Sequence, residues 1–471
     1  MTKNFKLSKI IPQLNEEVLA QNIFPYFYNN ICGDLFLEKS NISQIVLENG
    51  EITKNIQSSS GGFSIRKVAA DGMMYFLSST DLSFEKILEY SEKLGVLSPK
   101  FPIETSFRSF ELFSTEYFSS LVGEIYKVNY DTSILIMEIY TYIKKKGHVE
   151  NLIISIACNA NHREIFNEKT HVVEKFKVLW SLHINLVLKK DEKTENFYKG
   201  MSRQEGWDFL KNNWKNMANF VWESCYDLLH AIQVTAGIKT LVCAPGECGT
   251  MLHEAVGHAL ESDFLATNTS CFSGKQGLPI ANTCVTVMDN GQMPYMRGTI
   301  EYDDEGTPAA ANILIKDGIF VGELSNKFYS QKQNKNSSGN GRRENFACNV
   351  IPRMTNTFLM NGTSTLEEMI LKISDGIFVK DIGGGQVDIS TGSFVFEARL
   401  AYLIKDGKIT TPIKGAMLMG NALEALFNIT EVGNDFSLCN GSGNCGKNNQ
   451  TVPVCVGCPS FTLENITVGG K

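Results

Sequence analysis

The sequence predicts an α+β protein of two domains. We expect residues 1–234 to form an N-terminal α+β domain with an antiparallel sheet, and residues 235–471 to form a β-rich, barrel-like C-terminal domain. Three observations support this prediction. The chain of 471 residues is too long for a single hydrophobic core. Helical and extended patterns alternate in its first half, whereas short apolar runs separated by Asp-Gly and Asn-Gly steps dominate the second.

The first half of the chain mixes strand and helix signals. Residues 45–47 lead into a polar Asn-Gly turn, and residues 61–68 carry apolar side chains at alternate positions, so both segments predict strands. Further strands are expected at residues 152–159 and 173–188, and helices at residues 82–94, 132–144 and 207–232. Glycines and short apolar runs become more frequent after residues 235–237, and we place the boundary between the domains there.

Short apolar runs followed by turn residues characterise the second half. Repeated Asp-Gly and Asn-Gly steps between such runs are typical of β-hairpins, and several in succession indicate a barrel. The expected strands are residues 285–288, 313–315, 394–396 and 401–404, the turns following three of them at residues 289–291, 316–318 and 405–407. Residues 331–344 contain almost no apolar side chains, and we expect a mobile loop there.

Composition excludes several classes of protein. A formal net charge of −7 argues against nucleic acid as a partner, because phosphate binding usually requires a basic excess. The sequence predicts no export signal and no membrane-spanning segment, since no apolar run approaches the required length. Twelve cysteines are scattered along the chain without the dense spacing of a disulfide framework. We therefore expect a cytoplasmic protein with reduced thiols.

Residues 241–263 place ionisable side chains on an otherwise apolar helix. A short strand ends near Cys243, a Pro-Gly turn follows, and a helix begins near Gly249. The apolar residues recur at helical spacing and predict a buried face: Met251, Leu252, Ala255, Val256, Ala259 and Leu260. His253, Glu254 and His258 accompany them. Because buried ionisable groups need partners or a metal ion, this segment is the candidate functional site.

The spacing of the two histidines requires a distorted helix. Residues five apart point roughly 140° from each other in a regular α-helix, so His253 and His258 would not meet at one metal ion. A π-type turn restores their alignment, and Gly257 is a plausible place for it. In that arrangement neutral imidazoles would hold zinc, zinc would acidify a water molecule, and Glu254 would be the general base. The alternative is a hydrogen-bonded structural cluster without metal.

A third metal ligand is needed, and imidazole or thiolate is the expected type. None of the other five histidines stands in a motif.

Eight ordered segments resemble the signature of the TldD/PmbA peptidases. The segment HEAVGHALESD at residues 253–263 is the most specific of them. The N-terminal half is similar only loosely, around residues 61–70. The other seven segments are residues 302–307, 339–344, 352–357, 383–388, 443–447, 450–454 and 467–470.

The resemblance implies a zinc-dependent metallopeptidase that hydrolyses unfolded or flexible peptides inside an oligomeric cavity. It implies that Cys445 is the third ligand beside His253 and His258, with one Zn²⁺ per active chain. Thiolate is suitable because zinc binds it and keeps it deprotonated. The presence of the His-Glu motif indicates the catalytic TldD type. The implied assembly is a homo-oligomer or a heterodimer with a PmbA/TldE-like subunit.

Three other interpretations remain open. The chain could be a non-catalytic peptide-binding scaffold subunit with structural zinc, or a cysteine peptidase using Cys445 as nucleophile. Cys455 and Cys458, near Cys439 and Cys445, could also form a separate structural zinc site, although packing thiols are the simpler interpretation. Four charged residues are further candidates for substrate contact: Asp303, Asp304, Arg342 and Arg343.

Overall fold

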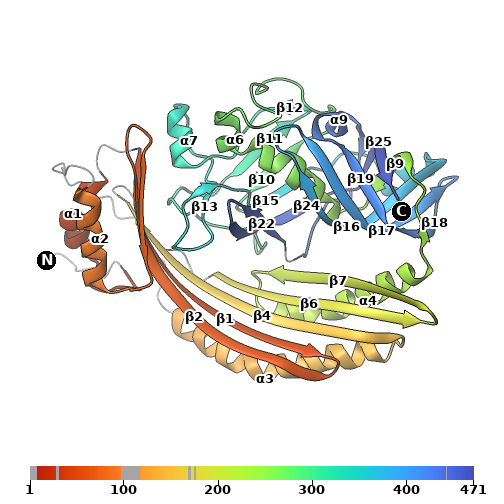
Figure 1. Ribbon diagram of the computed structural model, residues 1–471, viewed down its shortest axis with the longest axis horizontal. Coiled ribbons are helices and arrows are strands. Elements are labelled where there is room, and N and C mark those ends of the chain that lie inside the picture. The colour runs from red at the N-terminus through yellow and green to blue at the C-terminus, as the bar shows by residue number, and fades with distance from the viewer. Residues whose placement is uncertain are drawn as a thin grey trace.

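The computed structural model describes residues 8–27, 31–96, 117–167, 171–173, 177–441 and 443–470, without side chains for residues 16, 96, 117–130 and 171–173. A long, curved antiparallel sheet from the first half of the chain lies beneath a β-rich body from the second half (Figure 1). This α+β architecture confirms the predicted fold class. The division at residues 234 and 235 stays a prediction.

The curved sheet has the strand order β3-β2-β1-β4-β6-β7, with β5 paired to β4. Its first hairpin is unusually long, at 17 and 18 residues per strand. Asn49 and Gly50 join the two strands with positive φ angles of 49° and 96°, which explains the Asn-Gly sequence. The strands are β1 (Cys32–Glu48), β2 (Glu51–Val68), β3 (Met74–Ser79), β4 (Val149–Phe166), β5 (His171–Val173), β6 (Lys177–Lys190) and β7 (Lys193–Arg203).

Two long helices cover the face of this sheet that points away from the β-rich body. They are α3 (Tyr117–Lys144) and α4 (Trp207–His230), and Figure 1 shows α3 along the outer side of the curve. Ile139 of α3, Ile154 of β4 and Leu210 of α4 belong to one buried cluster. A second cluster packs α1 (Glu16–Asn22), η1 (Phe24–Tyr26) and α2 (Phe84–Val96) against β1 and β2. The opposite face of the sheet is therefore free to meet the second half of the chain.

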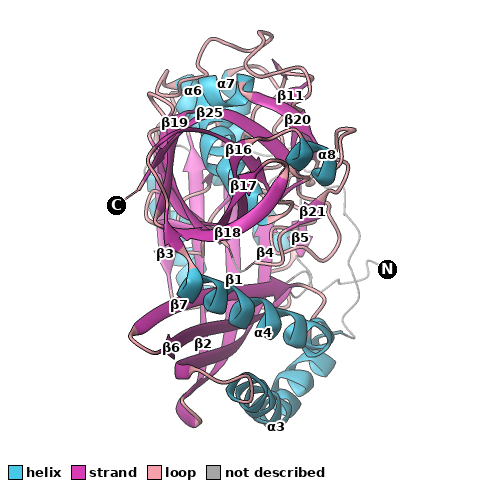
Figure 2. Cartoon of the chain, turned by 90° about the vertical axis from the view of Figure 1, so that its right-hand side faces the viewer, coloured by secondary structure: helices cyan, strands magenta, loops and turns pink. Residues whose placement is uncertain are grey.

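Five strands of the second half close into a barrel, which confirms the barrel-like prediction. The order is β16-β9-β25-β19-β17, and β17 pairs back with β16. Figure 2 shows these strands grouped in the upper part of the molecule. The strands are β9 (Gly237–Cys243), β16 (Asp375–Val387), β17 (Ser393–Lys405), β19 (Ala416–Asn421) and β25 (Phe461–Gly469). β8 (Ile232–Gln233), β18 (Lys408–Lys414) and β20 (Ile429–Val432) extend this sheet.

A second sheet and two short hairpins complete the β-rich body. The sheet has the order β12-β11-β10-β15-β24-β21, with β10 (Val287–Asn290), β11 (Ala311–Lys316), β12 (Ile319–Phe320), β15 (Asn356–Leu359), β21 (Ser437–Leu438) and β24 (Cys455–Cys458). The hairpins are β13 (Gly341–Arg342) with β14 (Ile351–Pro352), and β22 (Asn444–Lys447) with β23 (Gln450–Pro453). Short helices are α6 (Ser262–Ala266), α7 (Lys327–Lys332), α8 (Leu366–Leu371) and α9 (Ala422–Phe427). No helix among the described residues has the length and apolarity needed to span a membrane.

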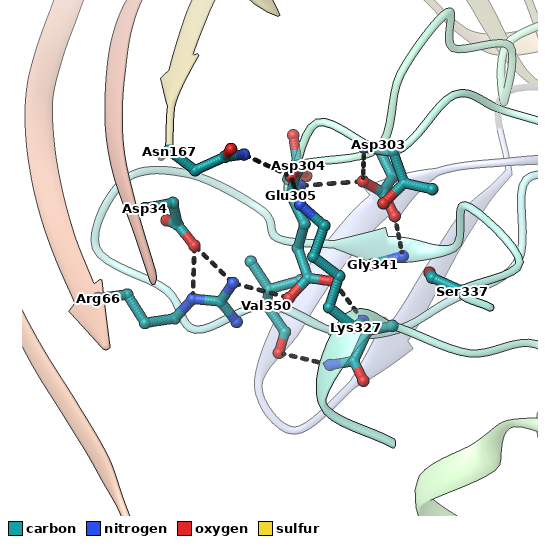
Figure 3. A network of polar contacts seen from close by, with 12 residues as sticks. Asp34, Arg66, Asn167, Asp303, Asp304, Glu305, Lys327, Ser337, Gly341 and Val350 are labelled. Atoms are coloured by element: carbon teal, nitrogen blue, oxygen red, sulfur yellow. Dashed lines mark hydrogen bonds and ion pairs between the residues drawn. The ribbon is translucent and has the colours of Figure 1, made fainter. Parts of the chain in front are cut away.

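Buried ion pairs join the curved sheet to the β-rich body (Figure 3). Arg66 of β2 contacts Asp34 of β1 at 2.5 Å and Glu305 at 2.7 Å. Arg343 reaches the same Asp34 at 2.8 Å. The four side chains are at most 2% exposed. We call Asp34, Arg66, Glu305 and Arg343 the anchor cluster, since it links strands early in the chain to loops some 240–310 residues later.

Two local predictions were wrong because tertiary hydrogen bonds overrode the local pattern. Asp289 was expected in a turn but belongs to β10, where it is fully buried and accepts hydrogen bonds from Thr355 and Thr357. Residues 331–344 were expected to be a mobile loop, yet the segment starts within α7 and ends in β13. Asn340 in it is 1% exposed and donates to Asp289 and to the Arg353 carbonyl. This segment lacks apolar residues, and polar contacts hold it instead.

Candidate metal centre and active site

A distorted helix carries the two histidines. After β9 the chain runs through η2 (Glu247–Gly249) and α5 (Thr250–Leu252) into a π-helical turn, η3 (His253–Gly257), followed by η4 (His258–Leu260). The π-turn confirms the distortion predicted from the spacing of the histidines. A Cβ at Gly257 would lie 1.9 Å from the Sδ of Met354, so the Met354 side chain would have to move. Close packing therefore favours glycine at this position.

The structure brings His253, His258 and Cys445 together. One ligand atom from each lies within 4.8 Å of the other two, and no other such group of His, Cys, Asp or Glu occurs among the described residues. The two imidazole rings are 5.3 Å apart and almost perpendicular. Cys445 Sγ lies 3.3 Å from His258 Nε2. The cysteine is supplied by β22, more than 180 residues from the helix.

The chemistry of the three side chains fits a soft divalent cation. All are buried, with 3%, 6% and 1% exposure for His253, His258 and Cys445. Among the described residues, His253 Nδ1 has no hydrogen-bond partner although it is buried. Burial opposes ionisation of Cys445, but the adjacent His258 and His253 outweigh it and hold the thiol pKa well below its usual value. Thiolate with imidazole is a donor set that zinc prefers.

A carboxylate contacts the second histidine, and a lysine contacts that carboxylate. Glu261 Oε2 lies 3.0 Å from His258 Nδ1, which leaves Nε2 directed at Cys445. Lys447 donates to Glu261 at 2.8 Å and reaches Asp263 at 2.7 Å. Burial raises the pKa of Glu261, yet His258 and Lys447 outweigh it and lower it to about 2. Such a carboxylate fixes the tautomer of a ligand histidine.

Sequence reasoning assigned no role to Glu261 or Lys447. Both lie inside the quoted segments, three residues after His258 and two residues after Cys445. A carboxylate one helical turn from a candidate ligand was the signal that could have identified Glu261.

Glu254 occupies a different position from the three buried side chains. Its side chain is 31% exposed, and Oε2 lies 3.9 Å from His258 Nε2. Together with His253 it lines a cavity of about 290 Å³ between β7 and the β-rich body. A carboxylate beside the cluster and open to this cavity can exchange protons with water or with a bound ligand. We call this space the active-site cavity.

One wall of the active-site cavity carries balanced charges. Lys199 of β7 pairs with Glu247 at 2.6 Å and with Asp381 at 2.5 Å. Arg399 also pairs with Asp381. Since each of these charges has an opposite partner, this wall carries no net charge.

Buried arginines hold the hairpin that supplies Cys445. Arg353 donates to the carbonyls of Cys445 and Gln450, and Arg342 donates to the carbonyl of Pro453 at 2.9 Å. Arg353 and Arg342 are 0% and 4% exposed. Backbone carbonyls on both strands of the hairpin are thereby fixed, which sets the position of the thiolate relative to the helix.

We call His253, His258 and Cys445 the metal cluster, and the remaining sequence candidates do not belong to it. Asp303 and Asp304 are buried, at 1% and 6% exposure, and belong to loops next to the anchor cluster (Figure 3). Arg343 is part of the anchor cluster itself. Cys455 and Cys458 are buried in β24, and neither belongs to a group of potential ligands within the described residues. The described residues therefore contain no second cysteine metal site.

Two family models match the chain. Residues 237–470 match the model described as the PmbA/TldA metallopeptidase C-terminal domain, and residues 33–93 match PmbA/TldA metallopeptidase domain 1. The first match includes the helix, the hairpin with Cys445 and the whole barrel. The second includes β1, β2 and most of α2.

Curated relatives carry the same family name. The chain is 44% identical over 242 residues to a metalloprotease TldD homolog of Haemophilus influenzae, which is 51% of this chain and 50% of that protein. The match thus spans about half the length of this relative. A metalloprotease of Methanocaldococcus jannaschii is 28% identical over 435 residues, which is 89% of this chain and 93% of that protein.

Solved structures share the fold. TldE from Thermococcus kodakarensis superposes with a TM-score of 0.72 at 18% identity, covering 93% of this chain and 96% of its own. A protein of Thermotoga maritima gives a TM-score of 0.74 at 17% identity with the same coverage. At this identity the likeness concerns the fold alone. With both family models and the curated relatives in agreement, the chain belongs to the PmbA/TldD family of metallopeptidases.

Proposed function

We propose that the protein is a zinc-dependent peptidase with one Zn²⁺ per active chain, held by His253, His258 and Cys445. The observation that carries the proposal is the convergence of these three buried side chains on one point beside an accessible carboxylate. A relative in Saccharolobus solfataricus, 26% identical over 310 residues, is named a zinc metalloprotease TldD homolog. Two imidazoles and one thiolate are a suitable zinc ligand set.

Glu254 is the general base in this proposal. Zinc bound in the cluster would act as a Lewis acid toward a water molecule or a substrate carbonyl. Glu254 stands next to His258 on the side open to the active-site cavity, so its carboxylate can accept the proton of an attacking water. Glu261 and Lys447 hold His258 in the tautomer that presents Nε2 to the cluster.

Flexible, unstructured peptides are the proposed substrates. The active-site cavity lies between the curved sheet and the β-rich body, where an extended chain fits more readily than a folded domain. We propose that the active species is an oligomer enclosing this site, either of this chain alone or with a TldE-like subunit. The structural likeness to TldE supports a partner of this fold.

Two alternatives make different predictions for the same site. A cysteine peptidase would use the Cys445–His258 pair, whose atoms are 3.3 Å apart. Cys445 is only 1% exposed, however, and a nucleophile must reach its substrate, whereas Glu254 is accessible. A scaffold subunit with structural zinc would bind metal and peptide without cleaving it.

The decisive experiment combines metal analysis with a cleavage assay. Full-length protein, alone and mixed with a TldE-like subunit, is assayed for zinc content and for hydrolysis of casein and an unfolded peptide. We expect about one zinc per chain and activity that a chelator removes and zinc restores. Activity that survives complete metal removal but not thiol alkylation would support the cysteine peptidase. Bound zinc without any cleavage would support the scaffold.

Substitution of the base isolates the chemical step. Glu254→Gln keeps the size of the side chain but cannot accept a proton, so we expect zinc content and fold to be unchanged. General base catalysis typically contributes about 10²–10⁴-fold, and kcat should fall by an amount in this range. Normal turnover in zinc-loaded Glu254→Gln would contradict the assigned role. Glu323→Gln, a change of the same kind in a carboxylate that pairs with Lys335 and does not line the active-site cavity, serves as the control.

A further inference from the structure

A second cavity adjoins the active-site cavity. It has a volume of about 400 Å³ and lies between the curved sheet and the β-rich body. The sheet contributes polar side chains, among them Gln44, Asn159 and Asn161, and the other wall includes the β22–β23 hairpin. Asn444 lines both cavities, so they meet at this residue. A chain extending from the metal cluster past Asn444 would enter the second cavity.

Two arginines of the second cavity donate hydrogen bonds to one end of the β22–β23 hairpin. Asn444 pairs with Pro453 at the open end of β22 and β23. Arg297 donates to the Gly443 carbonyl at 2.9 Å and to Asn444 Oδ1 at 2.6 Å. Arg342 donates to the Pro453 carbonyl at 2.9 Å. Both guanidinium groups are therefore held against the end of the hairpin that carries Asn444 and Pro453.

Neither guanidinium has a direct ion-pair partner among the described residues, although Asp304 and Cys445 are close enough to Arg342 to oppose the lowering of its pKa. Arg297 and Arg342 donate to carbonyl, amide and hydroxyl oxygens, and neither forms an ion pair with any residue that the structure describes. Burial lowers the pKa of each to about 10, so both still carry a positive charge at neutral pH. A desolvated charge without a counter-charge is unfavourable.

Among the carboxylates around the second cavity, Asp304 acts most strongly on Arg342, but it forms no ion pair with this arginine. Asp304 is already shared by the Arg163 side chain and the Arg343 backbone, at 3.0 and 2.7 Å. Glu344 accepts from the Thr451 backbone. Burial and the neighbouring Glu305 raise the pKa of Asp303 to about 7, which weakens its negative charge near neutral pH.

We propose that the second cavity is a substrate subsite that binds a carboxylate through Arg297 and Arg342. The carboxylate comes from an Asp or Glu side chain of the peptide or from its C-terminus, since both present the same planar anion. Arginine is suited to this recognition because its N–H groups match the two oxygens of a carboxylate. This inference rests on the proposed peptidase function, because it assumes that a peptide occupies the active-site cavity.

The test measures binding, so that it does not depend on turnover. Full-length Glu254→Gln protein is titrated with fluorescent versions of one unstructured decapeptide. In one arm a single Glu is moved along the sequence and compared with Gln at each position. In the other arm the C-terminal acid is compared with the amide. We expect at least one carboxylate to tighten binding by about tenfold, and the arm that responds identifies its source.

Removal of one cation should abolish the preference. Arg297→Gln, introduced into the Glu254→Gln protein, is expected to bind acidic and neutral peptides equally. Lys408→Gln, which removes an exposed positive charge on β18 outside both cavities, is the matched control and should retain the tenfold preference. An acid preference that persists in Arg297→Gln, or equal binding of all peptides by the parent protein, would overturn the proposal.

A second variant covers the case in which Arg297→Gln disturbs the hairpin. Gln44→Glu introduces a carboxylate from the opposite wall, on β1, without touching the hairpin. It should reduce the acid preference while zinc content is unchanged, and an unaltered preference would count against the subsite. If the arginines only hold the hairpin, Arg297→Gln would lower zinc content and leave the acid preference intact. Failure of the peptidase proposal would instead appear as peptide binding without cleavage by the unsubstituted enzyme.

Discussion

The metal cluster and the anchor cluster both bury charged side chains, but they use them differently. In the anchor cluster Arg66 and Arg343 share Asp34, and Arg66 also contacts Glu305, so every charge has an opposite partner. In the metal cluster the ligand atoms face one another, and His253 Nδ1 has no partner among the described residues. Buried charges that are fully paired indicate a structural role, whereas two imidazoles and a thiol that converge on one point are a donor set suited to a divalent cation.

The anchor cluster consists of contacts between residues that are far apart in the sequence. The anchor cluster joins β1 and β2 to loops beyond residue 300, so its role is to hold the curved sheet against the β-rich body. Both cavities lie between these two parts. The anchor cluster thus positions the walls of the site without including a metal ligand, and its Arg343 also lines the second cavity.

The largest effect is expected when a metal ligand is removed. Cys445→Ala eliminates the thiolate, so most of the zinc and nearly all peptide hydrolysis should be lost. Cys284→Ala, which removes a partly exposed thiol outside the cluster, should retain both. Elemental analysis of the purified proteins with a parallel cleavage assay makes the measurement. Full zinc occupancy in Cys445→Ala would exclude the thiolate as a ligand.

Removal of a charge from the anchor cluster should lower the free energy of unfolding and leave the three metal ligands in place. Asp34→Asn leaves Arg66 and Arg343 with less negative charge, and such a change in a buried pair costs about 3–5 kcal/mol. Lys372→Ala, which removes an exposed pair with Glu431, should cost less than about 1 kcal/mol. Urea unfolding of both variants supplies the comparison. Equal stabilities would mean that the anchor cluster contributes no more than a surface pair.

Loss of the carboxylate behind His258 should weaken metal binding to a smaller extent. Glu261→Gln retains a hydrogen-bond acceptor but removes the charge that orients the imidazole and pairs with Lys447. Substitutions of this kind typically reduce metal affinity by about 10–100-fold. Competition with a zinc chelator of known affinity measures the change. An unchanged affinity would show that backbone geometry alone positions His258.

A further effect, visible only as a pH dependence of stability, is expected from Asp303. Burial and Glu305 raise its pKa from 3.8 to about 7 in the folded protein. The folded state then holds a proton that the unfolded state has released, so Asp303 reduces stability as pH rises from about 4 to 7 and has no further effect above that. The slope is at most about 1.4 kcal/mol per pH unit. Asp303→Asn should flatten this part of the curve in thermal melts across that range; a curve parallel to that of the parent protein would contradict the raised pKa.

Several features of the site could be predicted from the sequence because they depend on local geometry. The i,i+5 spacing of His253 and His258 predicted a π-turn, and the structure contains one. The Asn-Gly step at residues 49–50 and the Asp-Gly step at residues 317–318 predicted hairpins, which form with positive φ angles at these positions. Such features follow from a few neighbouring residues and need no knowledge of the rest of the chain.

Other features were decided only by the tertiary structure. Asp289 reads as a turn residue but joins a strand because Thr355 and Thr357 satisfy its carboxylate. Residues 331–344 were predicted to be a mobile loop, but Asn340 within them is held by Asp289, a partner far away in the sequence.

The sequence by itself determined the hairpin turns at residues 49–50 and 317–318 and the distorted turn that carries the two histidines. Only the tertiary structure decided which charged side chains are paired and which are not. Arg343 finds Asp34 in the folded chain, whereas Arg297 finds no carboxylate among the described residues. The reason is physical: backbone conformation depends on nearest neighbours, but the free energy of a buried charge depends on groups that only folding brings within a few ångströms.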